Sequence, residues 1–174
     1  MESVENKKNT LEESVAFESQ RLIFKLSWNV DSAELAAQGN DINIASAVGD
    51  RFPFPYTVEE ADNFKKYVKE VWVKGTEYNF GIFSKDTGSY IGNNGFKTME
   101  DKSVISNIGY WLGKAHHGKG YATEALRAIL DFIKIKFPQV KEIHAGAFAY
   151  NIASQSVLKK CGFVEVAPKK VRRF

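Results

Sequence analysis

Cysteine and long apolar segments are scarce in this sequence. Cys161 is the single cysteine among 174 residues, so no internal disulfide can form within the chain. So little cysteine is typical of a protein from a reducing compartment, and we expect a cytoplasmic location. No apolar run approaches the roughly 20 residues that cross a bilayer, so the sequence predicts no membrane partner.

An excess of charge of one sign is also absent. The chain has 24 Lys and Arg against 21 Asp and Glu, which gives a net charge of +3. The densest basic run, residues 169–173, is more readily explained as a solvated terminus than as a binding patch, so we expect no nucleic-acid partner. The three histidines include no pair at the spacing of a helical metal site, and no metal site is predicted.

Length and composition favour one domain. Hydrophobic residues make up 44% and charged residues 26% of the chain, which are ordinary values for a globular protein. A domain of this size buries roughly 70% of the surface that its unfolded chain exposes. Residues 1–16 are mostly polar and lack the apolar segment of a signal peptide, so we expect a disordered leader there. Residues 17–174 are expected to form a single domain.

Periodicity and turn residues predict alternating strands and helices. Asp31 or Ser32 can cap a helix at 33–38, and Thr57 with Glu60 forms a capping box for a helix that ends near Gly75. This order predicts an α/β (α+β) fold, a mixed sheet with helices on its faces. We expect strands at 21–26, 78–83, 90–96, 104–112, 141–148 and 163–166, and helices at 33–38, 57–75, 121–137 and 151–161, with 40–49 either helical or irregular.

The most informative segment joins the predicted strand 104–112 to the predicted helix 121–137. Gly118 and Gly120 let the backbone fold around an anion without a Cβ in the way. The helix N-terminus adds unpaired N–H groups and a partial positive charge, so the pattern predicts a phosphate cradle. A tight strand-to-helix turn explains such a short pattern equally well. A P-loop is excluded, because Lys119 is followed by Gly120 and not by Ser or Thr.

Three segments of the chain resemble one family. His117-Gly118-Lys119-Gly120-Tyr121-Ala122 is similar to the Arg/Gln-x-x-Gly-x-Gly/Ala acetyl-CoA motif of the GNAT acetyltransferase superfamily, with His117 in the place of Arg or Gln. The segment 151–163 resembles the "N-x-x-S … V-L-x-K-x-G-F" pattern of its RimJ/RimL-like branch. Ser19-Gln20-Arg21-Leu22 resembles the first strand of that branch, so the resemblance covers residues 17–163.

The resemblance implies a fold, an activity and a cofactor site. The sheet is expected to be mostly antiparallel and to splay apart beside its fourth strand, 104–112. The activity implied is acetyl-CoA-dependent N-acetylation of a primary amine, either a protein N-terminal α-amine or a small amine or polyamine, by direct attack in a ternary complex. No metal is implied. The residues implied in acetyl-CoA binding are Trp111, Leu112, His117, Gly118, Lys119, Gly120, Tyr121, Ala122, Thr123, Asn151 and Ser154.

The sequence offers more than one candidate for each catalytic group. Many GNAT enzymes protonate the departing thiolate with a tyrosine on the last helix, and this chain has Leu158 at that position. Ser154 is the candidate replacement, although a serine bonded to its own helix is an equal alternative. Tyr110 and Glu77 are candidates for the general base, and a base acting through ordered water is another. His144 is better explained as a core or surface histidine.

Other functions also stay open. Leu158 is compatible with a non-catalytic acetyl-CoA-binding module, and a different acyl-CoA is a further alternative. The acceptor loops carry no specificity signature. Members of the family continue beyond Gly-Phe through a final pair of strands, whereas only residues 164–174 follow here. The last strand is therefore missing, short or supplied by a partner chain in a homodimer.

Overall fold

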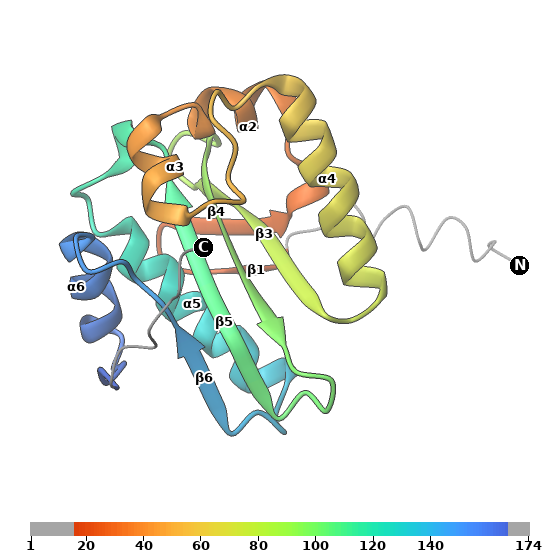
Figure 1. The fold of residues 1–174 in the computed structure, drawn as a ribbon, viewed down its shortest axis with the longest axis vertical. Helices are drawn as coiled ribbons and strands as arrows, with labels where there is room; N and C mark the ends of the chain where they lie inside the picture. The colour runs from red at the N-terminus through yellow and green to blue at the C-terminus, as the bar shows by residue number, and fades with distance from the viewer. Residues whose placement is uncertain (1–15, 167–174) are drawn as a thin grey trace, which may run out of the picture.

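The computed structural model describes residues 16–166, which build a six-stranded sheet with helices on both faces (Figure 1). The strands lie in chain order, and every neighbouring pair is antiparallel except β5 and β6, which are parallel. This arrangement confirms the expected mixed, mostly antiparallel α/β fold. The strands are β1 (Phe17–Glu18), β2 (Leu22–Leu26), β3 (Glu77–Ser84), β4 (Tyr90–Thr98), β5 (Val104–Leu112) and β6 (Glu142–Ala145).

Four of the five α-helices within residues 16–166 begin where the sequence supplies a capping side chain. Asp31 accepts hydrogen bonds from the first amides of α2, and Thr57 accepts one from the Glu60 N–H at the start of α4, as expected for N-caps. The segment 40–49, for which helix and loop were alternatives, contains a helix. None of the helices within residues 16–166 is long and apolar enough to cross a membrane. The helices are α2 (Ser32–Gly39), α3 (Ile42–Val48), α4 (Val58–Val73), α5 (Tyr121–Lys136) and α6 (Ile152–Lys160), with 3-10 turns η1 (Ser27–Asn29) and η2 (Lys114–His116).

Two hydrophobic clusters hold the layers together, one on each face of the sheet. The larger cluster joins α5 to the sheet, and α5 contributes a continuous stripe that includes Leu126, Ile129 and Ile133. The smaller cluster lies under α2 and α4 and includes Leu35 and Tyr90. We call the first face the α5 face and the second the α4 face. Because consecutive residues of a strand point to opposite faces of the sheet, the position of a site residue along β3, β4 or β5 determines whether it lies on the α5 face or on the α4 face.

The sheet loses its pairing beside β5. The last residues paired between β5 and β6 are Ile108 and Ala145, whereas β5 continues to Leu112. The two strands part towards their carboxyl ends (Figure 1). Residues 109–112, which we call the unpaired edge of β5, have no strand partner on this side within the described part of the chain. The splay expected beside the strand 104–112 is therefore confirmed.

Two sequence expectations about the strands were wrong, and one short strand was not predicted. Residues 163–166 are not in a strand, because no strand within residues 16–166 pairs with them, and Val164 and Val166 are both exposed. The strand expected at 141–148 is limited to β6, and its residues are exposed or half-buried where a buried strand was expected. The short β1 was missed, because two residues carry no periodicity. It is held by the ring of Phe17, which stacks on that of Phe24 with centroids 4.3 Å apart.

Candidate active site

The start of α5 differs from the start of every other α-helix in the described residues. Side chains cap α2, α3, α4 and α6, whereas the N-cap of α5 is Gly120, and no side chain bonds to the amides of its first turn. Gly118 and Gly120 have φ angles of +73° and +78°, a left-handed conformation that glycine adopts without strain. The amides of residues 121–123 are thus free at the positive end of a sixteen-residue helix.

The turn before α5 folds back onto the end of β5. The Nε2 atom of His117 lies 2.8 Å from the carbonyl oxygen of Leu112, which ties the turn to the last residue of the strand. His116 is half-buried, and burial, reinforced by Lys119 and His117, lowers its pKa. The N-terminus of α5 and the Lys119 side chain both contribute positive potential at this place. The backbone amides and the unpaired edge of β5 therefore lie at adjacent places in the fold.

Two of the three candidate catalytic residues come together on the α5 face. The Oη atom of Tyr110 and the Oγ atom of Ser154 are 2.9 Å apart, which joins the unpaired edge of β5 to the first turn of α6. Asn151 caps α6 by accepting a hydrogen bond from the Ser154 N–H. Burial raises the pKa of Tyr110, although the hydrogen bond with Ser154 opposes that shift. Tyr110 is therefore a protonated hydroxyl near neutral pH and is unsuited to be a general base.

The third candidate, Glu77, lies elsewhere. It is at the start of β3 and faces α4, where the Oη of Tyr67 donates to its carboxylate at 2.7 Å and the Nζ of Lys97 lies 3.2 Å away. Burial, followed by the bond to Glu77, raises the pKa of Tyr67 to about 12. The Glu77 side chain is only 16% exposed. The structure therefore does not bring Glu77 together with Ser154 and Tyr110.

A polar residue that sequence reasoning missed connects Glu77 to the middle of the sheet. The Nδ2 of Asn79 donates to Glu77 at 3.2 Å, so its Oδ1 is turned away from the carboxylate. A Cβ on Gly95 would meet this oxygen at 2.4 Å, so the oxygen lies over Gly95 on β4. The only sequence signal was a polar residue between Tyr78 and Phe80 in an otherwise apolar strand.

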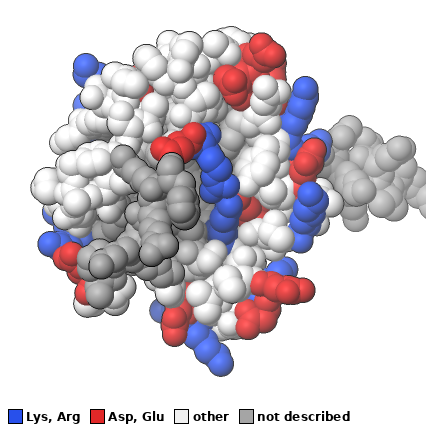
Figure 2. Space-filling view, in the orientation of Figure 1, with Lys and Arg blue, Asp and Glu red and all other residues white. Residues whose placement is uncertain are grey.

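The glycine that pairs with Gly95 leaves open space on the α4 face. Gly109 is the first residue of the unpaired edge of β5, and a Cβ built on it meets no atom within 4 Å. Trp111, two residues on, packs against Phe52 with ring centroids 5.5 Å apart. Acidic and basic side chains lie next to one another at the centre of the face that carries α3 and α4 (Figure 2). The backbone of β5 at Gly109 is therefore not covered by any atom within reach of a Cβ.

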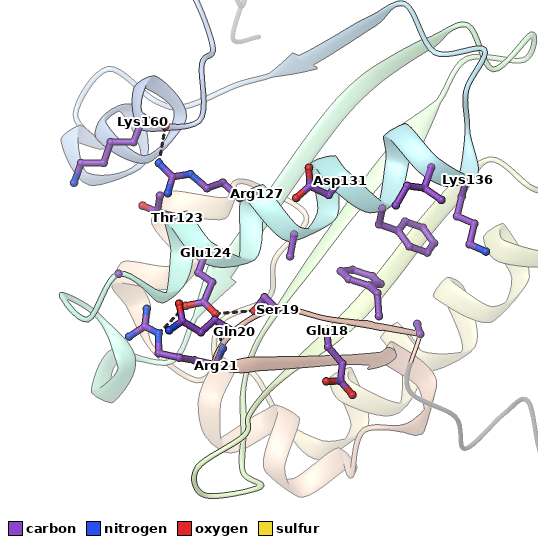
Figure 3. A pocket seen from close by; sticks show the side chains of 16 residues that line it. Glu18, Ser19, Gln20, Arg21, Thr123, Glu124, Arg127, Asp131, Lys136 and Lys160 are labelled. Carbon is purple, nitrogen blue, oxygen red and sulfur yellow. Dashed lines mark hydrogen bonds and ion pairs between the residues drawn. The ribbon is translucent and has the colours of Figure 1, made fainter.

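A second network surrounds the glycine turn from the other side. Arg21, at the start of β2, points towards Glu124 in the first turn of α5, and Ser19 bonds to the same carboxylate (Figure 3). A groove of about 770 Å³ begins beside Gly120 and Thr123 and runs along α5. None of the residues that line this groove belongs to β5 or β6. The groove is therefore separate from the unpaired edge of β5, and it meets the turn before α5 at Gly120.

The remaining expectations concern His144 and metal binding. His144 is exposed on β6 and lies 3.1 Å from Glu142, as expected for a surface histidine. Among residues 16–166, no three His, Cys, Asp or Glu side chains gather in a group that fits a metal ion.

Known proteins share this sequence pattern and this fold. Residues 21–164 match the family model described as "Acetyltransferase (GNAT) domain". A Bacillus subtilis (strain 168) protein described as "Probable N-acetyltransferase YjcK" is 37% identical over 122 residues, which cover 67% of this chain and 66% of that protein. A Bacillus licheniformis protein, "Uncharacterized N-acetyltransferase p20", is 33% identical over 45% of this chain and 44% of its own length. The chain thus spans less than two thirds of the length of these curated relatives.

Solved structures agree in fold. RimL, a ribosomal L7/L12 α-N-protein acetyltransferase in complex with coenzyme A, superposes with a TM-score of 0.73 at 17% identity, over 86% of this chain and 84% of that one. A GNAT-family acetyltransferase from Bacillus anthracis superposes with a TM-score of 0.69 at 21% identity, over 83% and 81% of the two chains. Since the family model covers most of the sequence, the chain belongs to the GNAT acetyltransferase domain family.

Proposed function

We propose that this chain is an acetyl-CoA-dependent N-acetyltransferase that transfers an acetyl group to a primary amine. The observation that carries the proposal is the start of α5, where two left-handed glycines leave the helix amides uncapped beside the unpaired edge of β5. Uncapped amides at a helix N-terminus suit the diphosphate of coenzyme A. The unpaired backbone groups of residues 109–112 suit the amides of its pantetheine arm. The RimL relative was solved with coenzyme A, which agrees with this assignment.

The α5 face supplies the groups for the departing sulfur in this proposal. Transfer breaks the thioester C–S bond and forms a C–N bond. The attacking neutral amine loses one proton to water, and the coenzyme A thiolate gains one proton that enters from water by way of Ser154. The Ser154 hydroxyl is held by Tyr110 at 2.9 Å and would donate to the sulfur. Tyr110 keeps its proton, because burial raises its pKa, so it can donate to Ser154 Oγ at the same time. This pair would take the place of the tyrosine that Leu158 replaces.

The α4 face is where we propose that the amine enters. Gly109 lies next to Tyr110 in β5 and so faces the opposite side of the sheet, where the space above it is open. The Oδ1 of Asn79 lies over the neighbouring Gly95 and would accept a hydrogen bond from the amine. Glu77 would act through Asn79, as the group that orients its carboxamide. The proton lost by the amine would then leave through water.

The cofactor half of the proposal is tested by calorimetric titration with coenzyme A. A glutamate at position 120 would strain a left-handed residue and bring a carboxylate towards the diphosphate, so Gly120→Glu is expected to weaken binding by at least about 100-fold. Gly88→Glu is the matched control. Gly88 has a φ of +69° and open space around it in the turn between β3 and β4, so the strain and the charge are equal. Equal losses in both variants, or no binding by the unmodified chain, would overturn the proposed cofactor site.

The acceptor is then identified by a coenzyme A release assay. The panel contains peptides with free N-termini, polyamines and aminoglycosides, because the name of RimL indicates a protein N-terminus and the amine classes are not otherwise distinguished. Turnover with one class defines the acceptor. Binding of acetyl-CoA without turnover across the panel would replace the enzyme proposal with the non-catalytic binding module that Leu158 keeps open.

A further inference from the structure

Arg21 makes three contacts with the turn at residues 117–120 and with the first turn of α5. Its Nε lies 2.6 Å from the Glu124 carboxylate, and its Nη1 donates to the carbonyl oxygen of Lys119 at 3.0 Å. Its guanidinium also lies over the ring of Tyr121, with Cζ 4.5 Å from the ring centroid. Lys119 and Tyr121 flank Gly120, the N-cap of α5. One side chain, from the residue just before β2, therefore contacts both neighbours of Gly120.

The bond to Lys119 fixes the direction of an amide. The peptide between Lys119 and Gly120 is planar and trans, so its carbonyl oxygen and its N–H point in opposite directions. Arg21 draws the carbonyl oxygen towards β2, and the Gly120 N–H must then point away from β2. Without that bond, Gly120 on one side of this peptide would allow it to rotate, because glycine permits several conformations at little cost.

Arg21 also offsets a charge that would repel an anion. Glu124 lies in the first turn of α5, where a carboxylate stabilises the helix but competes with a phosphate for the same positive potential. Ser19 Oγ and the Arg21 N–H both donate to its Oε1 at 2.7 Å. Burial alone would raise the pKa of Glu124, but these hydrogen bonds and the Arg21 charge lower it, so the carboxylate stays ionised. The guanidinium is thus the counter-charge of a permanent anion beside the cradle.

We propose that Arg21 is a positioning residue for diphosphate binding, which aims the Gly120 amide through the Lys119 carbonyl and neutralises Glu124. Arg21 contacts no reacting atom. The inference rests on the proposed function, since it concerns the same cofactor site. The polar side chains of Ser19 and Arg21 thus join the start of β2 to a turn and a helix about 100 residues away in the sequence.

The test compares two probes that differ in the diphosphate. Coenzyme A is titrated directly, and pantetheine, which lacks the nucleotide and its phosphates, is measured by competition. Arg21→Ala is expected to weaken coenzyme A about tenfold and pantetheine less than about twofold, because only the former uses the Gly120 amide. A role in general folding would weaken both probes alike. Lys85→Ala is the matched control, since the Lys85 side chain pairs with Glu18 on β1, while its backbone N–H, which the substitution keeps, donates to the Arg21 carbonyl oxygen. Both probes should change less than about twofold.

Three further variants separate the orientation of the Gly120 amide from the neutralisation of Glu124. Glu124→Gln removes the anion and leaves the Lys119 bond, so coenzyme A should bind at least as tightly as before. The double variant Arg21→Ala/Glu124→Gln should regain only the electrostatic part of the loss. Arg21→Lys keeps the charge without the guanidinium fork, and is expected to lose about threefold even if Arg21→Ala fails to fold. Arg21 has no positioning role if the unmodified chain binds coenzyme A but neither Arg21→Ala nor Arg21→Lys changes the ratio of the affinities for coenzyme A and pantetheine. The proposed cofactor site would stand in that case. No binding by the unmodified chain removes both.

Discussion

The two faces of the sheet at the edge of β5 are built in different ways. On the α5 face, the candidate groups come from short continuous segments, 117–123 and 151–154, and many of them are backbone amides. On the α4 face, they are side chains from separate elements: Tyr67 from α4, Asn79 from β3 and Lys97 from β4. A ligand that is the same for every member of a family can be held by backbone geometry. A ligand that differs between members is recognised by side chains, which change without disturbing the fold.

The largest effect on catalysis is expected at Ser154. Ser154→Ala removes the hydroxyl that faces Tyr110, and we expect kcat to fall about 100-fold, with the Kd of coenzyme A unchanged. Tyr110→Phe should give a smaller fall, because it leaves the serine in place. Since burial raises the pKa of Tyr110 above its ordinary value, the tyrosine stays protonated and adds no ionisation to the rate profile below about pH 9. The measurement is a rate profile with the acceptor that the release assay identifies. An unchanged kcat in Ser154→Ala would mean that water protonates the thiolate and that Ser154 has no catalytic role on the α5 face.

The same contrast explains which parts of the site could be predicted from the sequence. The left-handed turn before α5 was predictable, because Gly118 and Gly120 favour a local conformation that directly precedes a periodic helix. The pairing of Tyr110 with Ser154 was not, because they are 44 residues apart and only the packing of α6 on the sheet joins them. Asn79 was missed for the same reason. Its role depends on Gly95 across the sheet and on Glu77 beside it.

Elements of the fold were likewise predicted where the signal lies within one segment, and missed where it depends on distant residues. Periodic helices and their caps, such as Asp31 before α2, were predicted because one segment contains the whole signal. The strand expected at 163–166 was wrong because β-branched and aromatic residues indicate only a local preference for extended backbone. A strand also needs a neighbour to satisfy its backbone, and no segment within residues 16–166 supplies one. The role of Arg21 lies between these cases. Its segment was recognised by resemblance, but its contacts with the turn required the fold.

An intermediate effect is expected from filling the space above Gly109. Gly109→Ala and Gly109→Val put side chains where no atom lies within 4 Å, and the position has no left-handed φ, so the strand should tolerate them. We expect kcat/KM for the amine to fall in the order of side-chain size, to about 20-fold for valine, because the amine is displaced from the edge of β5. The Kd of coenzyme A and the melting temperature are the controls. Equal losses of amine turnover and coenzyme A affinity would mean that the two faces are not separate.

The smallest effect is expected from Glu77→Gln, which tests whether the α4 face works by orientation. Glutamine can donate from its Nε2, so the carboxamide of Asn79 would be free to reverse and present its Nδ2 over Gly95. A donor in place of an acceptor should raise the KM for the amine about fivefold, without a change in the Kd of coenzyme A. Tyr67→Phe is the matched control, because it removes one hydrogen bond from Glu77 but keeps the carboxylate that orients Asn79. If Glu77 were a general base, Glu77→Gln would instead lower kcat far more than it raised KM and would remove an ionisation from the acid side of the rate profile. Steady-state kinetics at several pH values therefore distinguish a positioning carboxylate from a proton acceptor on this face.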